Sequence, residues 1–134
     1  MNTDLPLTMA GPTAAKKILI IDDDQDILET MGSLLESEGF AVQSAETVDR
    51  GVEMIDDAQP DLILLDIMFP EGKARGFEAA HQIKGRYPQI PIFVLTAINR
   101  QYAFDFRKED VQAEEFLNKP VHIEKLVKLI NSYI

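Results

Sequence analysis

The sequence predicts an α/β protein built as a single domain on a doubly wound, five-stranded parallel sheet flanked by about five helices. Two observations support this fold class. Short apolar runs alternate with amphipathic stretches from Lys17 to Ile134, as in parallel sheets that carry helices on both faces. The length of 134 residues suits one domain and leaves no room for a second.

Three of the predicted strands are continuous apolar runs, which are typical of strands buried on both faces of a sheet. They cover residues 18–21, 62–65 and 92–95. Weaker runs at 40–44 and 114–117 predict two more strands. The sheet is therefore expected to have five strands.

Helical spacing of apolar residues predicts the first two helices between these strands. The first contains residues 27–35, and Gly39 marks its end. The second begins after Thr47, whose hydroxyl can cap its first turn, and ends before Pro60.

The later helices follow the same spacing, with one irregular region. Residues 77–83 predict a helix that Pro88 stops, and a terminal helix is expected after Pro120. In residues 98–113 the aromatic side chains alternate with period two, which does not fit an amphipathic helix. A short or distorted helix is expected there.

Composition restricts the functional class. Residues 1–16 hold two prolines and little apolar periodicity, so we expect a disordered leader there and a folded domain over 17–134. The leader lacks a basic start and a long apolar stretch, and we interpret the chain as cytoplasmic rather than secreted. The absence of cysteine excludes thiol chemistry. A formal charge of −10 argues against direct binding to nucleic acid.

Polar side chains follow four of the predicted strands. Asp22, Asp23 and Asp24 come after the first strand, and Asp66 ends the third. The fourth and fifth strands are followed by a hydroxyl and an ammonium group, those of Thr96 and Lys119. Because the carboxyl ends of parallel strands form one edge of the sheet, these groups are expected to converge there.

Such a set suits a divalent cation and a phosphoryl group. Crowded carboxylates repel one another, and a hard cation with oxygen ligands compensates the repulsion, so Mg²⁺ is predicted and Mn²⁺ is an alternative. Three ionised aspartates, Mg²⁺ and Lys119 would sum to zero charge. Asp66 is the best candidate for a nucleophile that attacks phosphorus. Asp24 could replace Asp22 or Asp23 as a ligand on this reasoning alone.

Four strings in order resemble the receiver domain of two-component response regulators: KILIIDDDQD, PDLILLDIMFP, IFVLTA and FLNKP. The intervals also fit, with 43 positions from Asp23 to Asp66, 30 from Asp66 to Thr96 and 23 from Thr96 to Lys119. The resemblance covers about residues 17–134. It implies a flavodoxin-like sheet with strand order 2-1-3-4-5.

The resemblance further implies a role for each site residue. Asp22, Asp23, Asp66 and the backbone carbonyl of Met68 would hold the metal, and Asp66 would accept the phosphoryl group. Thr96 and Lys119 would bind the phosphoryl oxygens, the peptide bond between Lys119 and Pro120 would be cis, and Phe116 would be the aromatic switch. The implied partners are a histidine kinase or phosphotransfer protein and an output protein or domain. The chain would thus be a switch that catalyses only its own phosphorylation and slow dephosphorylation, and not an enzyme.

Two departures from the family pattern stand out. The loop at residues 71–75 looks about two residues longer than is common, which could affect kinase docking. The irregular residues 98–113 belong to the output face of the family, and they put its usual dimer geometry in question.

Three other functions compete with a phosphoaccepting switch. A degenerate receiver would act as an unphosphorylated docking module, but the acidic, hydroxyl and lysine set is complete. A phosphatase that uses Asp66 as its nucleophile would need a second acid two positions later, where Met68 stands. A nucleotide or flavin binder would need a glycine-rich phosphate loop in place of the three acids after the first strand.

Overall fold

The structure is a computed structural model, which describes residues 15–67, 73–96 and 113–134. Five parallel strands form one sheet in the order β2-β1-β3-β4-β5. The strands are β1 (Lys17–Ile21), β2 (Ala41–Ala45), β3 (Leu62–Asp66), β4 (Ile92–Thr96) and β5 (Glu115–Asn118). The predicted fold class and strand order are confirmed, with bounds shifted by one residue or so. The leader predicted at 1–16 lies almost wholly outside the described residues.

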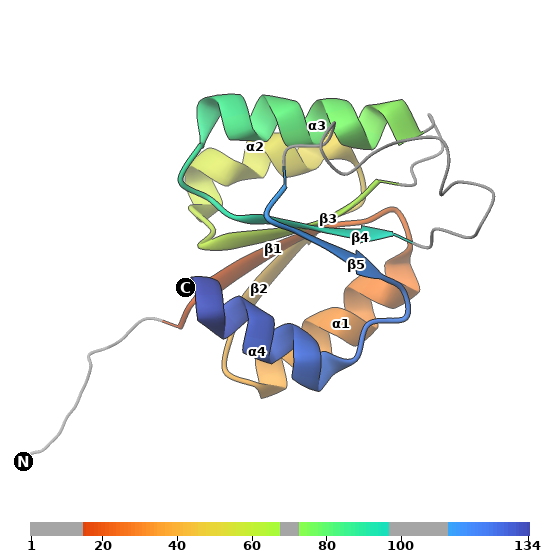
Figure 1. The fold of residues 1–134 in the computed structure, drawn as a ribbon, viewed down its shortest axis with the longest axis vertical. Coiled ribbons are helices and arrows are strands. Elements are labelled where there is room, and N and C mark those ends of the chain that lie inside the picture. The colour runs from red at the N-terminus through yellow and green to blue at the C-terminus, as the bar shows by residue number, and fades with distance from the viewer. Residues whose placement is uncertain (1–14, 68–72, 97–112) are drawn as a thin grey trace, which may run out of the picture.

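Four helices are found in the described part of the chain, against the five or so that we expected. Two of them, α1 (Gln25–Ser37) and α4 (Ile123–Tyr133), cover one face of the sheet, and α2 (Val48–Ala58) and α3 (Lys73–Arg86) cover the other (Figure 1). The irregular region predicted at 98–113 lies outside the described residues except for Ala113. None of the described helices has the length and apolarity needed to cross a bilayer.

Alternation along the strands divides the core into two clusters. In β1, Leu19 and Ile21 pack toward α2 and α3, whereas Ile18 and Ile20 pack toward α1 and α4. The central strand β3 is buried at all five positions because it has a neighbouring strand on each side and helices on both faces. This arrangement explains why its first four residues form an uninterrupted apolar run.

The helix boundaries follow local chemistry. The Thr47 hydroxyl accepts the Arg50 N–H and caps α2, as predicted. Gly39 follows α1 with a φ of 98°, a backbone conformation that favours glycine after a helix.

The start of α3 corrects one prediction. The helix begins at Lys73, so residues 73–75 are its first turn and not part of a long loop. Lysine, alanine and arginine are all good helix formers. In addition, the Arg75 guanidinium forms ion pairs with Asp49 of α2 and with Glu78 one turn later. These contacts explain why the helix extends beyond its apolar face.

Candidate functional site

Two buried carboxylates stand at the carboxyl ends of neighbouring strands. Asp22 directly follows β1 and is 1% exposed, and Asp66 ends β3 and is 3% exposed. Within the described ranges they are the two polar residues that are classed as buried. Buried charges are tolerated when they are paired and hydrogen-bonded, so their partners define the site.

Asp22 is held from three sides. Its main-chain N–H donates to the carbonyl of Ala45 at the end of β2, at 3.0 Å. One carboxylate oxygen, Oδ1, accepts the N–H of Asp24 at 2.9 Å, and the other, Oδ2, accepts a hydrogen bond from Lys119 Nζ at 2.8 Å. The carboxylate therefore has a fixed position although it lies in a turn.

Lys119 connects the two buried acids. Its Nζ atom lies 2.8 Å from Asp22 Oδ2 and 3.7 Å from Asp66 Oδ1. The lysine follows β5, and its peptide bond to Pro120 is cis, as the resemblance implied. A single ammonium group thus faces carboxylates from two other strands.

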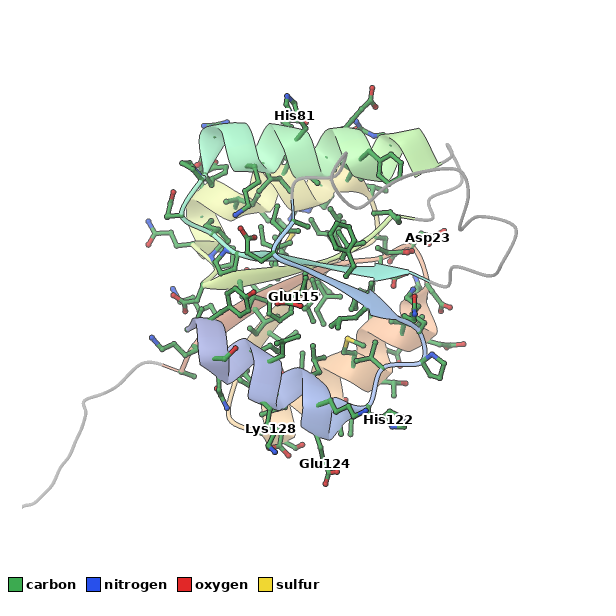
Figure 2. All side chains as sticks on the ribbon, viewed as in Figure 1. Asp23, His81, Glu115, His122, Glu124 and Lys128 are labelled. Carbon is green, nitrogen blue, oxygen red and sulfur yellow. The ribbon has the colours of Figure 1, made fainter. Side chains whose placement is uncertain are left out.

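A third carboxylate joins the cluster from the solvent side. Asp22, Asp23 and Asp66 each offer an oxygen atom, and these three atoms lie within 4.8 Å of one another. Asp23 is exposed, at the end of the sheet toward which the strand arrows point (Figure 2). With Lys119 included, the four ionised groups carry a net charge of −2, which a divalent cation would neutralise.

Asp24 has a different role from Asp22 and Asp23. It is the N-cap of α1, and its Oδ1 atom accepts the N–H groups of Asp26 and Ile27 at 3.0 and 3.4 Å. One of its two carboxylate oxygens is thus engaged in the cap, and the convergent carboxylate oxygens among the described residues belong to Asp22, Asp23 and Asp66. The cap therefore favours Asp22 and Asp23 over Asp24, which sequence reasoning from the residues alone had left open.

Two predicted site residues, Thr96 and Met68, lie partly or wholly outside the described residues. Thr96 ends β4 in register with Asn118 of β5, which places its backbone at the same edge of the sheet, but its side chain lies outside the described residues. Met68, whose carbonyl was predicted as a ligand, also lies outside them.

Phe116 lies on β5 and is half-buried against the core on the side of α2 and α3. Its neighbour Glu115 accepts a hydrogen bond of 2.6 Å from the Tyr133 hydroxyl at the end of α4. This hydrogen bond raises the pKa of Tyr133 above its usual range, and partial desolvation of the hydroxyl adds to the effect. The Tyr133 ring also meets Phe93 edge to face, with 5.1 Å between the centroids. The strand that carries Phe116 is thereby fastened to the last helix.

Neither of the two histidines belongs to the acid cluster. His81 and His122 are both exposed, and Figure 2 shows His81 on the outer side of α3, away from the sheet.

Sequence reasoning missed an ion pair at the end of β5 opposite to Lys119, where Glu114 directly precedes the strand. Lys84 Nζ lies 2.7 Å from Glu114 Oε2 and donates to the carbonyl of Ile90 at 2.8 Å. The other carboxylate oxygen of Glu114 accepts the N–H of Ile92 at 2.7 Å. No short motif could have indicated this pair, because its members are separated by 30 residues and the contact depends on the strand order.

The arrangement of acids and lysine at one sheet edge agrees with the comparison to known families. The model of the response regulator receiver domain matches residues 18–131. The chain belongs to this family. Receiver domains of two-component response regulators act in general as phosphoaccepting signalling switches and are not classed as enzymes.

Full-length regulators share this domain. The chain is 33% identical over 120 residues to the DNA-binding dual master transcriptional regulator RpaA of Synechocystis sp. and 32% identical over 114 residues to the response regulator MprA of Mycobacterium tuberculosis. These matches cover 88% and 83% of this chain but 48% and 47% of the relatives. The chain thus spans about half the length of these curated relatives.

Solved receiver structures superpose over most of the chain. A CheY-like receiver domain protein from Methanospirillum hungatei aligns with a TM-score of 0.76 and 29% identity over 88% of this chain and 92% of its own. The regulator TrrA from Thermotoga maritima, solved in complex with Mg²⁺–BeF, aligns with a TM-score of 0.75 and 27% identity over 89% and 99%.

Proposed function

We propose that Asp66 is the phosphoacceptor of this receiver domain and that it is phosphorylated by the phosphohistidine of a kinase or phosphotransfer protein. The observation that carries the proposal is the position of its carboxylate: buried at the end of the central strand, in a cluster with two other acids and 3.7 Å from Lys119. Among the relatives, RpaA is described as a transcriptional regulator and MprA as a response regulator, which agrees with this role.

The proposed reaction transfers one phosphoryl group. A carboxylate oxygen of Asp66 attacks phosphorus and forms a new P–O bond, while the bond from phosphorus to the histidine nitrogen breaks and the electron pair stays on the imidazole. With a small donor such as acetyl phosphate, acetate leaves instead. No oxidant or reductant is needed, and the product is an aspartyl phosphate.

Asp22, Asp23 and Asp66 are the residues that would hold Mg²⁺, together with the carbonyl of Met68. Their donor set fits, because carboxylate oxygens are the preferred ligands of Mg²⁺ and three lie within 4.8 Å of one another. Mn²⁺ takes the same ligands. When bound, the cation would neutralise charge on the phosphoryl oxygens. The complex of TrrA with Mg²⁺–BeF supports this part of the proposal.

Lys119 would exchange partners during phosphorylation. Its ammonium group now contacts Asp22 and Asp66, and a phosphoryl group on Asp66 would offer it a stronger acceptor. We propose that Thr96 binds a second phosphoryl oxygen and that Phe116 then turns further into the core. Because Glu115 next to Phe116 is bonded to Tyr133, the change would reach the surface of α4.

The partners follow from this role. A histidine kinase or phosphotransfer protein would supply the phosphoryl group, and an output protein or domain would respond to the altered surface. RpaA, a relative about twice as long as the match, is described as DNA-binding. For the present chain we propose no direct binding to nucleic acid, because its charge is −10.

The test is incubation with acetyl phosphate and Mg²⁺, followed by intact mass measurement. Wild type should gain one phosphoryl group and Asp66→Asn should gain none. Asp57→Asn is the matched control, because it removes the same charge from an exposed position on α2. A folded wild type that gains no mass would instead indicate a degenerate receiver that acts by docking alone.

A further inference from the structure

Two glycines, one on α2 and one on α3, lie against isoleucines that are adjacent in sequence to the buried acids. A Cβ atom on Gly51 of α2 would lie 2.5 Å from Cδ1 of Ile21, and one on Gly76 of α3 would lie 2.5 Å from Cα of Ile67. Ile21 immediately precedes Asp22, and Ile67 immediately follows Asp66. Each glycine therefore faces the neighbour of a buried site carboxylate.

The two close approaches differ in the kind of atom that is met. At Gly51 the three nearest atoms all belong to the Ile21 side chain, which can change its rotamer. At Gly76 the nearest atom is the main-chain Cα of Ile67, followed by its Cβ at 2.7 Å. No rotamer change moves these two atoms. A methyl group at position 76 must therefore displace either helix α3 or the main chain of Ile67.

The main chain of Ile67 is less restrained than helix α3, although the Ile67 side chain is itself fully buried. Helix α3 is anchored along its length by the fully buried Ala79, Ala80 and Ile83, and Arg75 ties its first turn to Asp49. In contrast, the strand pairing of β3 with β4 ends at Asp66, so Ile67 lies one residue beyond the described ladder. A shift of the Ile67 Cα atom would rotate the peptide that joins it to Asp66.

We propose that Gly76 is a positioning residue for the phosphoacceptor. By allowing α3 to lie directly against the main chain of Ile67, it fixes the backbone on which the Asp66 carboxylate stands. It thereby sets the separation of that carboxylate from Asp22, Asp23 and Lys119. The inference rests on the proposed phosphorylation of Asp66 and names a residue that touches none of the reacting atoms.

The experiment compares Gly76→Ala with Gly51→Ala, which adds the same methyl group at the same initial separation. For each folded variant, three quantities are measured: the urea midpoint of unfolding, the Mg²⁺ dissociation constant by NMR titration, and the initial rate of Asp66 phosphorylation by acetyl phosphate. Both variants should show a lower urea midpoint, because the added methyl group overlaps buried atoms of Ile21 in one variant and of Ile67 in the other.

Only Gly76→Ala should change the two site constants. We expect Mg²⁺ affinity to fall roughly tenfold, in the range seen when outer residues that orient metal ligands are removed. The phosphorylation rate should fall about tenfold to a hundredfold, because a misplaced nucleophile loses its alignment. Gly51→Ala should keep both constants within about twofold of wild type, since a side-chain adjustment of Ile21 leaves the backbone of Asp22 in place.

Wild-type values of either constant in folded Gly76→Ala would overturn the inference, as would equal losses in Gly51→Ala, which would indicate general destabilisation. If Gly76→Ala is partly unfolded, the measurements are repeated in trimethylamine N-oxide, which favours the folded state, once circular dichroism shows native helix content. Failure of the proposed function has a separate signature, because wild type itself would then gain no phosphoryl group at Asp66.

Discussion

The Nζ atom of Lys119 lies 2.8 Å from Oδ2 of Asp22, across 97 positions of sequence. Replacing Lys119 by alanine leaves Asp22 and Asp66 buried without this cation. We expect the metal-free variant to lose about 3 kcal/mol of unfolding free energy, as when one partner of a buried ion pair is removed. Urea unfolding in the presence of a chelator measures the loss. Lys128→Ala, an exposed change on α4, should leave the stability near that of wild type.

The same variant separates phosphorylation from the response to it. Lys119→Ala should still accept a phosphoryl group on Asp66, because the proposed nucleophile and the proposed metal ligands remain. The conformational response should be weaker by on the order of a few kcal/mol, since one charge-assisted contact to the phosphoryl oxygens is lost. The readout is the set of NMR shifts that phosphorylation induces in β5. Identical shifts in wild type and Lys119→Ala would contradict this prediction.

Added Mg²⁺ should raise the melting temperature of wild type, because the three carboxylates converge only in the folded chain. Asp23→Ala should abolish most of that rise, and it should stabilise the metal-free protein by relieving repulsion among the acids. Thermal unfolding with and without Mg²⁺ gives both numbers. Asp57→Ala, an exposed acid outside the cluster, should respond to Mg²⁺ like wild type. An undiminished rise in Asp23→Ala would remove Asp23 from the ligand set.

The pair of Lys84 and Glu114 should stabilise the fold through direct coupling. The Lys84 side chain is 13% exposed and that of Glu114 is 31% exposed, so solvent screens the pair only in part. We expect Lys84→Met and Glu114→Gln each to cost about 1 to 2 kcal/mol. A double-mutant cycle by urea unfolding should give a coupling of about 1 kcal/mol. Additive effects of the two substitutions would show that the pair contributes nothing as a pair.

Alkaline pH should weaken the attachment of β5 to α4. The hydrogen bond to Glu115 raises the pKa of Tyr133 above its ordinary value of 10.0, so the folded state favours the neutral phenol. Its contribution to stability is complete below the unfolded pKa and is lost as the pH rises through the raised folded-state pKa. The stability difference between wild type and Tyr133→Phe should therefore shrink between about pH 8 and about pH 11.5. Urea unfolding at both pH values measures it, and a constant difference would exclude this role for the hydrogen bond.

The strands and helix ends could be predicted from the sequence where a residue type strongly prefers one structural position. The buried strands were predictable because four apolar residues in a row fit a strand covered on both faces, and Thr47 and Gly39 have well-known positions at helix ends. The convergence of Asp22, Asp66 and Lys119 followed from the parallel sheet, since all three stand at carboxyl ends of strands.

Contacts between distant elements were not predictable in the same way. The extra first turn of α3 depends in part on Arg75 reaching Asp49 of another helix, and the capping of α1 by Asp24 decides between adjacent acids that look alike in sequence. The requirement at Gly76 is set by the distance between a helix and a strand end, which no local pattern encodes.

The burial of β3 at every position also determines how its amide hydrogens exchange with solvent. Since β3 is paired on both sides and covered on both faces, the Leu64 amide is expected to exchange only when the whole domain opens. Deuterium uptake at Leu64 would then report the global free energy, whereas the half-buried edge strand β5 opens at lower cost. A ligand that stabilises the entire fold should slow exchange at Leu64 and in β5, and one that orders only β5 should slow exchange in β5 alone. Strand β3 thus provides an internal reference against which the effects of the proposed phosphorylation at Asp66 can be measured.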